Sequence, residues 1–284
     1  MLPAMTHEIG TSRRPDRDLA VVIGAGGMGM AVARRLAQSY RVLIADLDAA
    51  RVREAAATLC AEGADATAIP CDITDPAAIA ALGARVGELG GLRALAHVAG
   101  LSPSMADFTT IVNVDLVGAA LVADELRRRA TIGSAAVFIA SLAAHNARPT
   151  EELDVLLADP SDQQLPQKLA DVLGEEATPA RAYELSKYAL IGFCRRQAAA
   201  WGERGARIVS LSPGLIATPQ GAREFERTPA KKALYDRTPL SREGTMLEIS
   251  DAVDFLLSDR ASFISGTDLL VDGGLAAALR WHSA

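Results

Sequence analysis

The chain has 284 residues, of which 50% are hydrophobic, 23% charged and 4% aromatic, and this length suits one large domain or two small ones. The composition excludes wholesale disorder, and a net charge of −6 argues against a nucleic-acid binder, which needs clustered lysine and arginine. Three scattered cysteines exclude a disulfide framework, and neither cysteine nor histidine spacing predicts a metal site, so we expect a reducing, cytoplasmic setting.

The beginning of the chain carries no sign of targeting to a membrane. Residues 1–18 mix arginines with acidic residues and lack an apolar core, so we expect a flexible N-terminal leader rather than a signal peptide. Further along, no apolar run reaches the roughly 18 residues that a membrane span needs. We therefore expect no membrane partner.

From residue 19 onward, short β-branched runs alternate with longer stretches rich in alanine, leucine and arginine. The runs predict strands over 19–23, 41–45, 66–70, 92–98, 135–140, 207–211 and 268–271. The longer stretches predict helices over roughly 28–38, 48–62, 75–88, 108–130, 179–203 and 247–257. This alternation is typical of an α/β fold with a doubly wound parallel sheet of about seven strands, whose ligands lie at the carboxyl ends of the strands.

Two stretches interrupt this alternation. Residues 142–178 separate the fifth strand from its helix, and within them 151–157 and 165–173 have helical character. Residues 215–243 contain several prolines and many charges before the last helix. We interpret the first stretch as an insertion and the second as a lid, both within a single domain.

The turn after the first strand reads G-A-G-G-M-G, in which Gly24, Gly26 and Gly29 fit the G-x-G-x-x-G pattern. In such a loop the first glycine allows a tight turn, the second lets the backbone approach a pyrophosphate, and the third allows close packing of helix on strand. The helix that follows directs its partial positive charge toward the phosphates. Placed between a strand and a helix, the pattern predicts a dinucleotide-binding site.

Asp46 ends the second strand, where a carboxylate accepts a hydrogen bond from a ribose 2′-hydroxyl. A 2′-phosphate would be repelled there and would require an arginine, and the nearest ones are Arg51 and Arg53. NAD is therefore favoured over NADP. The alternative is that Asp46 only caps the next helix, a role that Asp48 is equally able to fill.

The segment A-Y-E-L-S-K-Y places Tyr183 and Lys187 one helical turn apart, in a chain with only four tyrosines and four lysines. A phenol ordinarily ionises near pH 10, and an adjacent ammonium together with a positive nicotinamide ring would favour its phenolate. Tyr183 would then exchange the proton of an alcohol or carbonyl substrate. Ser141, at the end of the fifth strand, would hold the substrate oxygen.

The chain resembles the short-chain dehydrogenase/reductase family over roughly residues 19–275, and its motifs follow one another in the family's order. Further matches are C-D-I-T-D with Asp72, H-V-A-G at 97–100, V-D-L-V-G at 114–118, S-P-G-L-I-A-T-P at 212–219 and F-I-S-G-T-D-L-L-V-D-G-G at 263–274. The resemblance implies a Rossmann-type domain over 19–284, in which Asp72 contacts the adenine and Lys187 the nicotinamide ribose. It implies further cofactor contacts from Met28, Ala99, Gly100, Tyr183, Pro213, Gly214 and Thr218.

The chain departs from the family pattern at two places. Met28 and Met30 stand at later glycine positions of the family loop, so the path of this loop is open. The family's fourth catalytic residue, an asparagine, is replaced by Asp115, while Asn113 lies two residues earlier. As a fourth catalytic residue, Asp115 would fix a water that leads to Lys187 or act in protonated form; the alternative is a surface or cap residue.

The long interval between Ser141 and Tyr183 resembles the bacterial 3α-hydroxysteroid dehydrogenase/carbonyl reductase subgroup, as does the end of the chain. In that subgroup the insertion alters the packing of subunits. The resemblance implies a homo-oligomer, a dimer ahead of a tetramer. The alternative is that 142–178 is only a lid or loop.

The sequence thus predicts an enzyme that interconverts a secondary alcohol and a ketone by hydride transfer with NAD(H), cyclic or steroid-like substrates being one option. Tyr183, Lys187, Ser141 and Asp115 are the expected catalytic residues. Two alternatives remain open: a non-catalytic dinucleotide sensor on the same fold, and a reductase of C=C bonds such as an enoyl reductase. Members that reduce C=C bonds more often separate the tyrosine and lysine by six positions than by four.

Overall fold

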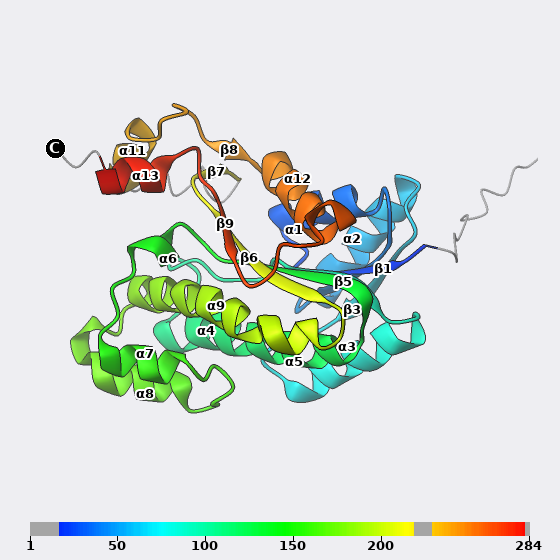
Figure 1. Cartoon of the computed structure of the whole chain (residues 1–284), viewed down its shortest axis with the longest axis horizontal. Coiled ribbons are helices and arrows are strands. Elements are labelled where there is room, and N and C mark those ends of the chain that lie inside the picture. Colours follow the sequence, from blue (N-terminus) through cyan, green and yellow to red (C-terminus); the bar gives the residue numbers. More distant parts are fainter. Residues whose placement is uncertain (1–16, 219–228, 282–284) are drawn as a thin grey trace, which may run out of the picture.

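The computed structural model describes residues 17–218 and 229–281, so most of the expected leader and the middle of the expected lid lie outside the described residues. Within them, one parallel sheet has the strand order β3-β2-β1-β4-β5-β6-β9 (Figure 1). Its strands are β1 (Leu19–Ile23), β2 (Arg41–Asp46), β3 (Ala66–Pro70), β4 (Leu92–His97), β5 (Ala130–Ile139), β6 (Arg207–Pro213) and β9 (Asp268–Val271). The predicted seven-stranded α/β fold is confirmed.

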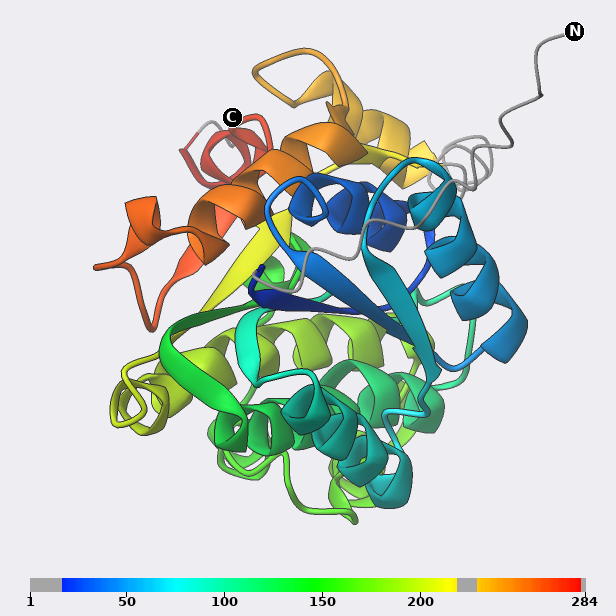
Figure 2. The same ribbon diagram turned by 90° about the vertical axis from the view of Figure 1, so that its right-hand side faces the viewer.

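Helices cover both faces of the sheet, as Figures 1 and 2 show from two directions. One face carries α1 (Gly27–Leu36), α2 (Ala49–Ala61) and α12 (Met246–Leu257). The opposite face carries α3 (Pro76–Glu88), α4 (Phe108–Val112), α5 (Ala119–Arg128) and α9 (Pro179–Gly202). Because side chains alternate along each strand, the sheet supplies an apolar core to each layer.

The strand order reverses between β1 and β4, so the loops after these two strands diverge to opposite faces of the sheet. Such a switch point at the carboxyl edge is where open α/β sheets bind ligands. The backbone N–H groups of Val98 and Ala99 both donate to the carbonyl oxygen of Ile23 at 2.8 Å. These bonds fix the H-V-A-G segment directly against the glycine loop.

The insertion forms α6 (Ala143–Asn146), α7 (Glu151–Leu157), α8 (Leu165–Leu173) and the short 3₁₀ turn η2 (Gly174–Glu176). The bounds of α7 and α8 match the two helical segments expected from the sequence. Both lie outside the layer of α4 and α9, on the side away from the sheet (Figure 1). Leu153, Leu157, Leu165 and Leu169 turn inward and join the core on this side.

The single helix expected over 108–130 is wrong, because a π-helical turn, η1 (Asn113–Gly118), lies between α4 and α5. The fifth strand also begins earlier than expected, at Ala130 instead of 135. Hydroxyl groups of Thr131 and Ser134 donate to the carbonyl oxygen of Leu92 and hold this irregular beginning of the strand on β4. Thr131, Gly133 and Ser134 interrupt the apolar run at this end of the strand, so the hydrophobic pattern did not reveal it.

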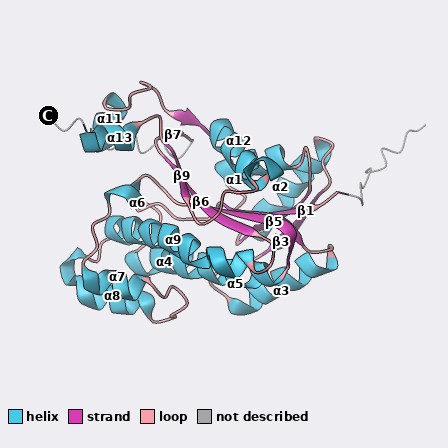
Figure 3. Ribbon diagram, in the orientation of Figure 1, coloured by secondary structure: helices cyan, strands magenta, loops and turns pink. Residues whose placement is uncertain are grey.

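Several short elements were not expected from the sequence (Figure 3). They are β7 (Ile216–Ala217), β8 (Gly244–Thr245), α11 (Pro229–Asp236), the 3₁₀ turn η3 (Asp259–Ala261) and α13 (Leu275–Trp281). β7 and β8 pair in parallel and connect the two described ends of the expected lid. In the described part of the chain, no helix is long and apolar enough to cross a membrane.

Candidate active site

The glycine loop joins β1 to α1 at the carboxyl edge of the sheet. Gly24 has a φ of +101°, and a Cβ on it would lie 2.8 Å from the backbone nitrogen of Ala99. A Cβ on Gly29 would overlap the carbonyl oxygen of Gly24, whereas a Cβ on Gly26 would meet nothing within 4 Å. The open backbone at Gly26, followed at once by the N-terminus of α1, fits a pyrophosphate group.

Asp46 at the end of β2 holds this loop in place. Its Oδ2 accepts the N–H of Ala25 at 2.7 Å, and its Oδ1 accepts the N–H of Asp48 at 2.9 Å. The cap of α2 is Asp48, which accepts the N–H groups of Ala50 and Arg51. Asp46 is therefore not the helix cap, and its carboxylate lies beside the glycine loop as a ribose-binding residue would.

Lys187 is the buried centre of the site. Its Nζ donates to the carbonyl oxygen of Ile139 at 3.1 Å and lies 3.2 Å from Oδ2 of Asp115. The same Nζ is 5.6 Å from the centre of the Tyr183 ring, one turn earlier on α9. Long-range packing thus fixes the ammonium from two sides, below the carboxyl end of β5.

Asp115 lies on η1 and is 1% exposed, so it is neither a surface residue nor a helix cap. Its Oδ1 accepts the N–H of Leu101 at 2.7 Å. Burial raises the pKa of its carboxyl group, against the opposing effects of the Lys187 ammonium and the Leu101 N–H. Burial, the largest single effect, would lower the pKa of Lys187, but the Asp115 carboxylate and Tyr183 together hold that pKa above its ordinary value.

The H-V-A-G segment connects the cofactor loop to this ion pair. A Cβ on Gly100 would lie 3.0 Å from Nζ of Lys187 and 3.4 Å from Oδ2 of Asp115. A side chain at this position would press on the two charged groups and displace them by a few tenths of an ångström.

Asp72, which follows β3, is not part of this ion pair. Its Oδ1 accepts the backbone N–H and the hydroxyl of Thr74.

Ser141 follows β5 two residues after Ile139, whose carbonyl oxygen binds Lys187. Its Oγ accepts the N–H of Ala143 at 3.2 Å, at the start of α6, which packs on α9. The N–H of Leu142 donates to the carbonyl oxygen of Pro213 at 2.9 Å. The segments after β5 and β6 are thereby joined at the same edge of the sheet.

Gly214 and Thr218 are the last two residues that the sequence analysis expected to contact a cofactor. The N–H of Gly214 donates to the carbonyl oxygen of Val271, and a Cβ on Gly214 would lie 2.6 Å from Cα of Asp272. Thr218 follows directly after β7. Met28 lies in the first turn of α1, so the loop continues into the helix despite the missing glycines.

His97, at the end of β4, is a feature of the site that the motifs did not single out. Its ring stacks on Phe138 with the centroids 5.1 Å apart, and among the described residues its Nε2 has no hydrogen-bond partner. Burial, with a smaller contribution from the charge of Lys187, lowers the pKa of His97 to about 3. The only hint in the sequence is the place of this histidine at the beginning of the H-V-A-G match.

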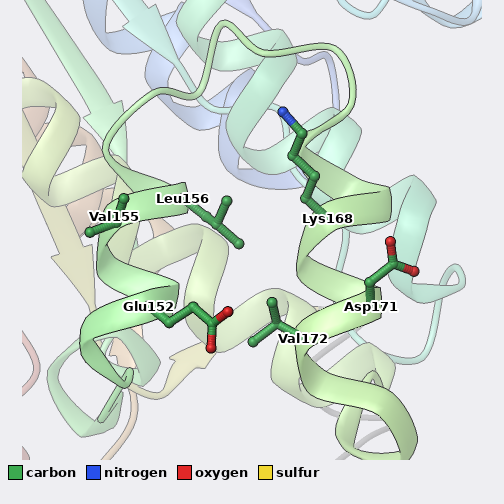
Figure 4. A pocket seen from close by; sticks show the side chains of 6 residues that line it. All are labelled: Glu152, Val155, Leu156, Lys168, Asp171 and Val172. Carbon is green, nitrogen blue, oxygen red and sulfur yellow. The ribbon is translucent and has the colours of Figure 1, made fainter.

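A pocket of about 380 Å³ lies away from this site, between α7 and α8 (Figure 4). Val155, Leu156 and Val172 form its apolar part, with Glu152, Lys168 and Asp171 at its margins. A second pocket of about 260 Å³ is lined by residues of α6, α7 and α9 and by Ala147 and Arg148 in the loop between α6 and α7. The pocket between α7 and α8 takes no residue from the group of side chains around Lys187.

Comparison with known proteins gives consistent results over most of the chain. Residues 23–156 and 169–276 match the family profile for Enoyl-(Acyl carrier protein) reductase. Short-chain dehydrogenase/reductase bsc3 of Alternaria brassicicola is 32% identical, over 91% of this chain and 96% of its own. The 3-alpha-hydroxysteroid dehydrogenase/carbonyl reductase of Comamonas testosteroni is 31% identical, over 67% of this chain and 75% of its own. A short-chain type dehydrogenase/reductase from Mycobacterium ulcerans has a similar structure, with a TM-score of 0.75, 25% identity, and coverage of 92% and 90% of the two chains.

Proposed function

Because the chain belongs to the short-chain dehydrogenase/reductase family, we propose that it interconverts a secondary alcohol and a ketone with NAD(H). The observation that carries the proposal is the arrangement of Tyr183, Lys187 and Asp115 at the carboxyl edge of the sheet, next to the glycine loop. The relative that acts, by its name, on hydroxysteroids and carbonyl compounds supports this class of reaction.

In this mechanism Tyr183 gives a proton to the carbonyl oxygen during reduction and takes it back during oxidation. Ser141 holds the same oxygen by a hydrogen bond, so that the proton transfer has a fixed geometry. Lys187 favours the phenolate of Tyr183 and binds the cofactor ribose. When bound, the nicotinamide supplies or accepts the hydride.

The cofactor is NAD in this proposal. Gly24, Gly26, Gly29 and the N-terminus of α1 hold the pyrophosphate, and Asp46 accepts from the ribose hydroxyl. Arg51 is the nearest cation for a 2′-phosphate, but its guanidinium lies within 3.6 Å of both Asp46 and Asp48. Two carboxylates next to that guanidinium would repel the extra phosphate of NADP.

Replacing Tyr183 by phenylalanine tests the mechanism. We expect Tyr183→Phe to lose at least about 1000-fold in turnover, since it lacks the only proposed proton donor, while it binds NADH as the wild type does. Turnover is followed at 340 nm with a panel of cyclic and acyclic alcohols and ketones, and binding by NADH fluorescence, with NADPH for comparison. Retained turnover in the variant would refute the role of Tyr183.

A second candidate is the reduction of a C=C bond, which the name of the matching family profile favours. Against it, Tyr183 and Lys187 are four positions apart, a spacing less typical of such reductases. An enoyl thioester in the same panel separates the two reactions. NADH binding without turnover of any substrate would instead favour a non-catalytic dinucleotide sensor.

The proposal also covers the assembly of the chain, its location and its domain organisation. The chain acts as a homo-oligomer, a dimer or a tetramer, in the cytoplasm. The insertion over 142–178 takes part in its assembly. The insertion and the Rossmann-type sheet belong to a single domain.

A further inference from the structure

The carboxylate at position 115 has a consequence for the pH range of the reaction. An asparagine would leave the ammonium of Lys187 as a full positive charge beside Tyr183. In this chain a buried carboxylate lies 3.2 Å from that ammonium, with both side chains at most 5% exposed. We propose that Asp115 is a positioning residue that cancels the charge of Lys187, so that alcohol oxidation begins at higher pH than it would beside an unpaired lysine.

Burial raises the pKa of Asp115, but the Lys187 ammonium and the hydrogen bonds around the carboxyl group oppose this effect and favour the ionised form. Oδ1 receives the N–H of Leu101 at 2.7 Å, and Oδ2 faces the Lys187 ammonium. A proton on either oxygen would point at a donor instead of an acceptor, and the carbonyl of Ile139 is already bound by Lys187. The carboxylate is therefore the form that fits this site.

Among the described residues around Lys187, no charged group other than Asp115 neutralises its ammonium. His97 from β4 is neutral because burial lowers its pKa to about 3. α4 contains no titratable side chain, and His145 of α6 is bound to Asp268 at 3.0 Å. Tyr183 on α9 and Asp115 on η1 are thus the titratable groups that determine the charge of this site.

The inference rests on the proposed role of Tyr183. Oxidation needs the phenolate of Tyr183 and reduction needs its phenol. A neutral Lys187–Asp115 pair stabilises the phenolate less than an unpaired ammonium does. The site is therefore suited to donating a proton to a ketone at neutral pH, and alcohol oxidation requires more alkaline solution.

The test is Asp115→Asn, which keeps the shape of the side chain and removes its charge. We expect the pH midpoint of alcohol oxidation to fall by about one unit, the change that one charge a few ångströms away produces. The matched control is Asp107→Asn, which removes the same charge from an exposed helix cap where asparagine serves equally well. The midpoint of the control is expected to stay at the wild-type value.

A spectroscopic titration gives the same answer without turnover. The phenolate absorbance near 295 nm is followed with pH in protein without cofactor, and the signal of the matching Tyr183→Phe protein is subtracted. The phenolate of Tyr183 should appear at lower pH in Asp115→Asn than in the wild type. Asp115→Ser, which also removes the carboxylate, should shift it in the same direction and replaces Asp115→Asn if that variant does not fold.

The outcomes distinguish this inference from the proposed function. An unchanged or higher midpoint, in folded variants with normal NADH binding, overturns the role of Asp115 and leaves the proposed reaction intact. Absence of turnover in every protein overturns the proposed reaction, while the phenolate titration still tests the ion pair.

Discussion

His97 is a buried imidazole whose surroundings keep it neutral. It shares a face of the sheet with Phe138, on which it stacks, and it receives no compensating carboxylate. Burial and the charge of Lys187 lower the pKa of His97 to about 3. At mildly acidic pH this ring is therefore protonated only in the unfolded chain. The residue therefore links folding to pH without taking part in the proposed proton transfer.

Stability should fall as the pH drops below about 6.5, the ordinary histidine value, because the unfolded chain then binds a proton that the folded protein refuses. The penalty grows until the pH reaches the folded pKa of about 3. Between pH 7 and pH 5 we expect His97→Asn to lose about 2 kcal/mol less unfolding free energy than the wild type. Urea unfolding at both pH values measures this, and equal losses in the two proteins would contradict it.

At the scale of elements, the glycine loop combines two different requirements. Gly29 has no room for a side chain because the carbonyl oxygen of Gly24 occupies the space, which is a demand of the fold. Gly26 has ample room and an ordinary extended backbone, with φ −73° and ψ −175°. Gly26 is also the N-cap of α1, a position that favours glycine over alanine, and the proposed pyrophosphate site would use the same open backbone.

These two positions therefore give opposite expectations. Gly26→Ala should lower the unfolding free energy by no more than about 1 kcal/mol, the cost of a poorer helix N-cap, yet weaken NADH binding by about tenfold or more. Gly29→Ala should destabilise the protein by about 1–3 kcal/mol because its Cβ overlaps the backbone. Thermal unfolding and NADH fluorescence titration measure both effects. Unimpaired NADH binding by Gly26→Ala would contradict the assignment of the pyrophosphate site.

The π-helical turn η1 is the element that delivers Asp115. Such turns insert one residue into a helix and change the direction of the side chains that follow, and they occur often at functional sites. Gly118 ends this turn, where a Cβ would lie 2.9 Å from the carbonyl oxygen of Ile73. Its close packing holds η1 against the core while Asp115 reaches Lys187.

At the scale of the whole molecule, we expect an assembly of two or four chains. Light scattering after size exclusion should therefore give about two or four times 29.7 kDa. Repeating the measurement across a hundredfold dilution, as a control, separates a stable assembly from concentration-dependent association. A mass of one chain at every concentration would contradict the expected homo-oligomer.

Much of the fold was predictable because its information is local. β-branched runs gave the positions of the strands, and α7 and α8 were found by helical character alone. Tyr183 and Lys187 were paired because one helical turn separates them. Regular periodicity failed at η1 and at the start of β5, where tertiary hydrogen bonds override the local pattern.

The class of fold, the glycine loop and the tyrosine–lysine pair were predictable from the amino-acid sequence, since each depends on residues close together in the chain. The contact of Asp115 with Lys187, 72 positions later, and the bond of the same ammonium to the Ile139 carbonyl were not predictable without the three-dimensional structure. The reason is physical: contacts between elements depend on how η1, α9 and β5 pack together, and no periodicity in one segment encodes the position of another.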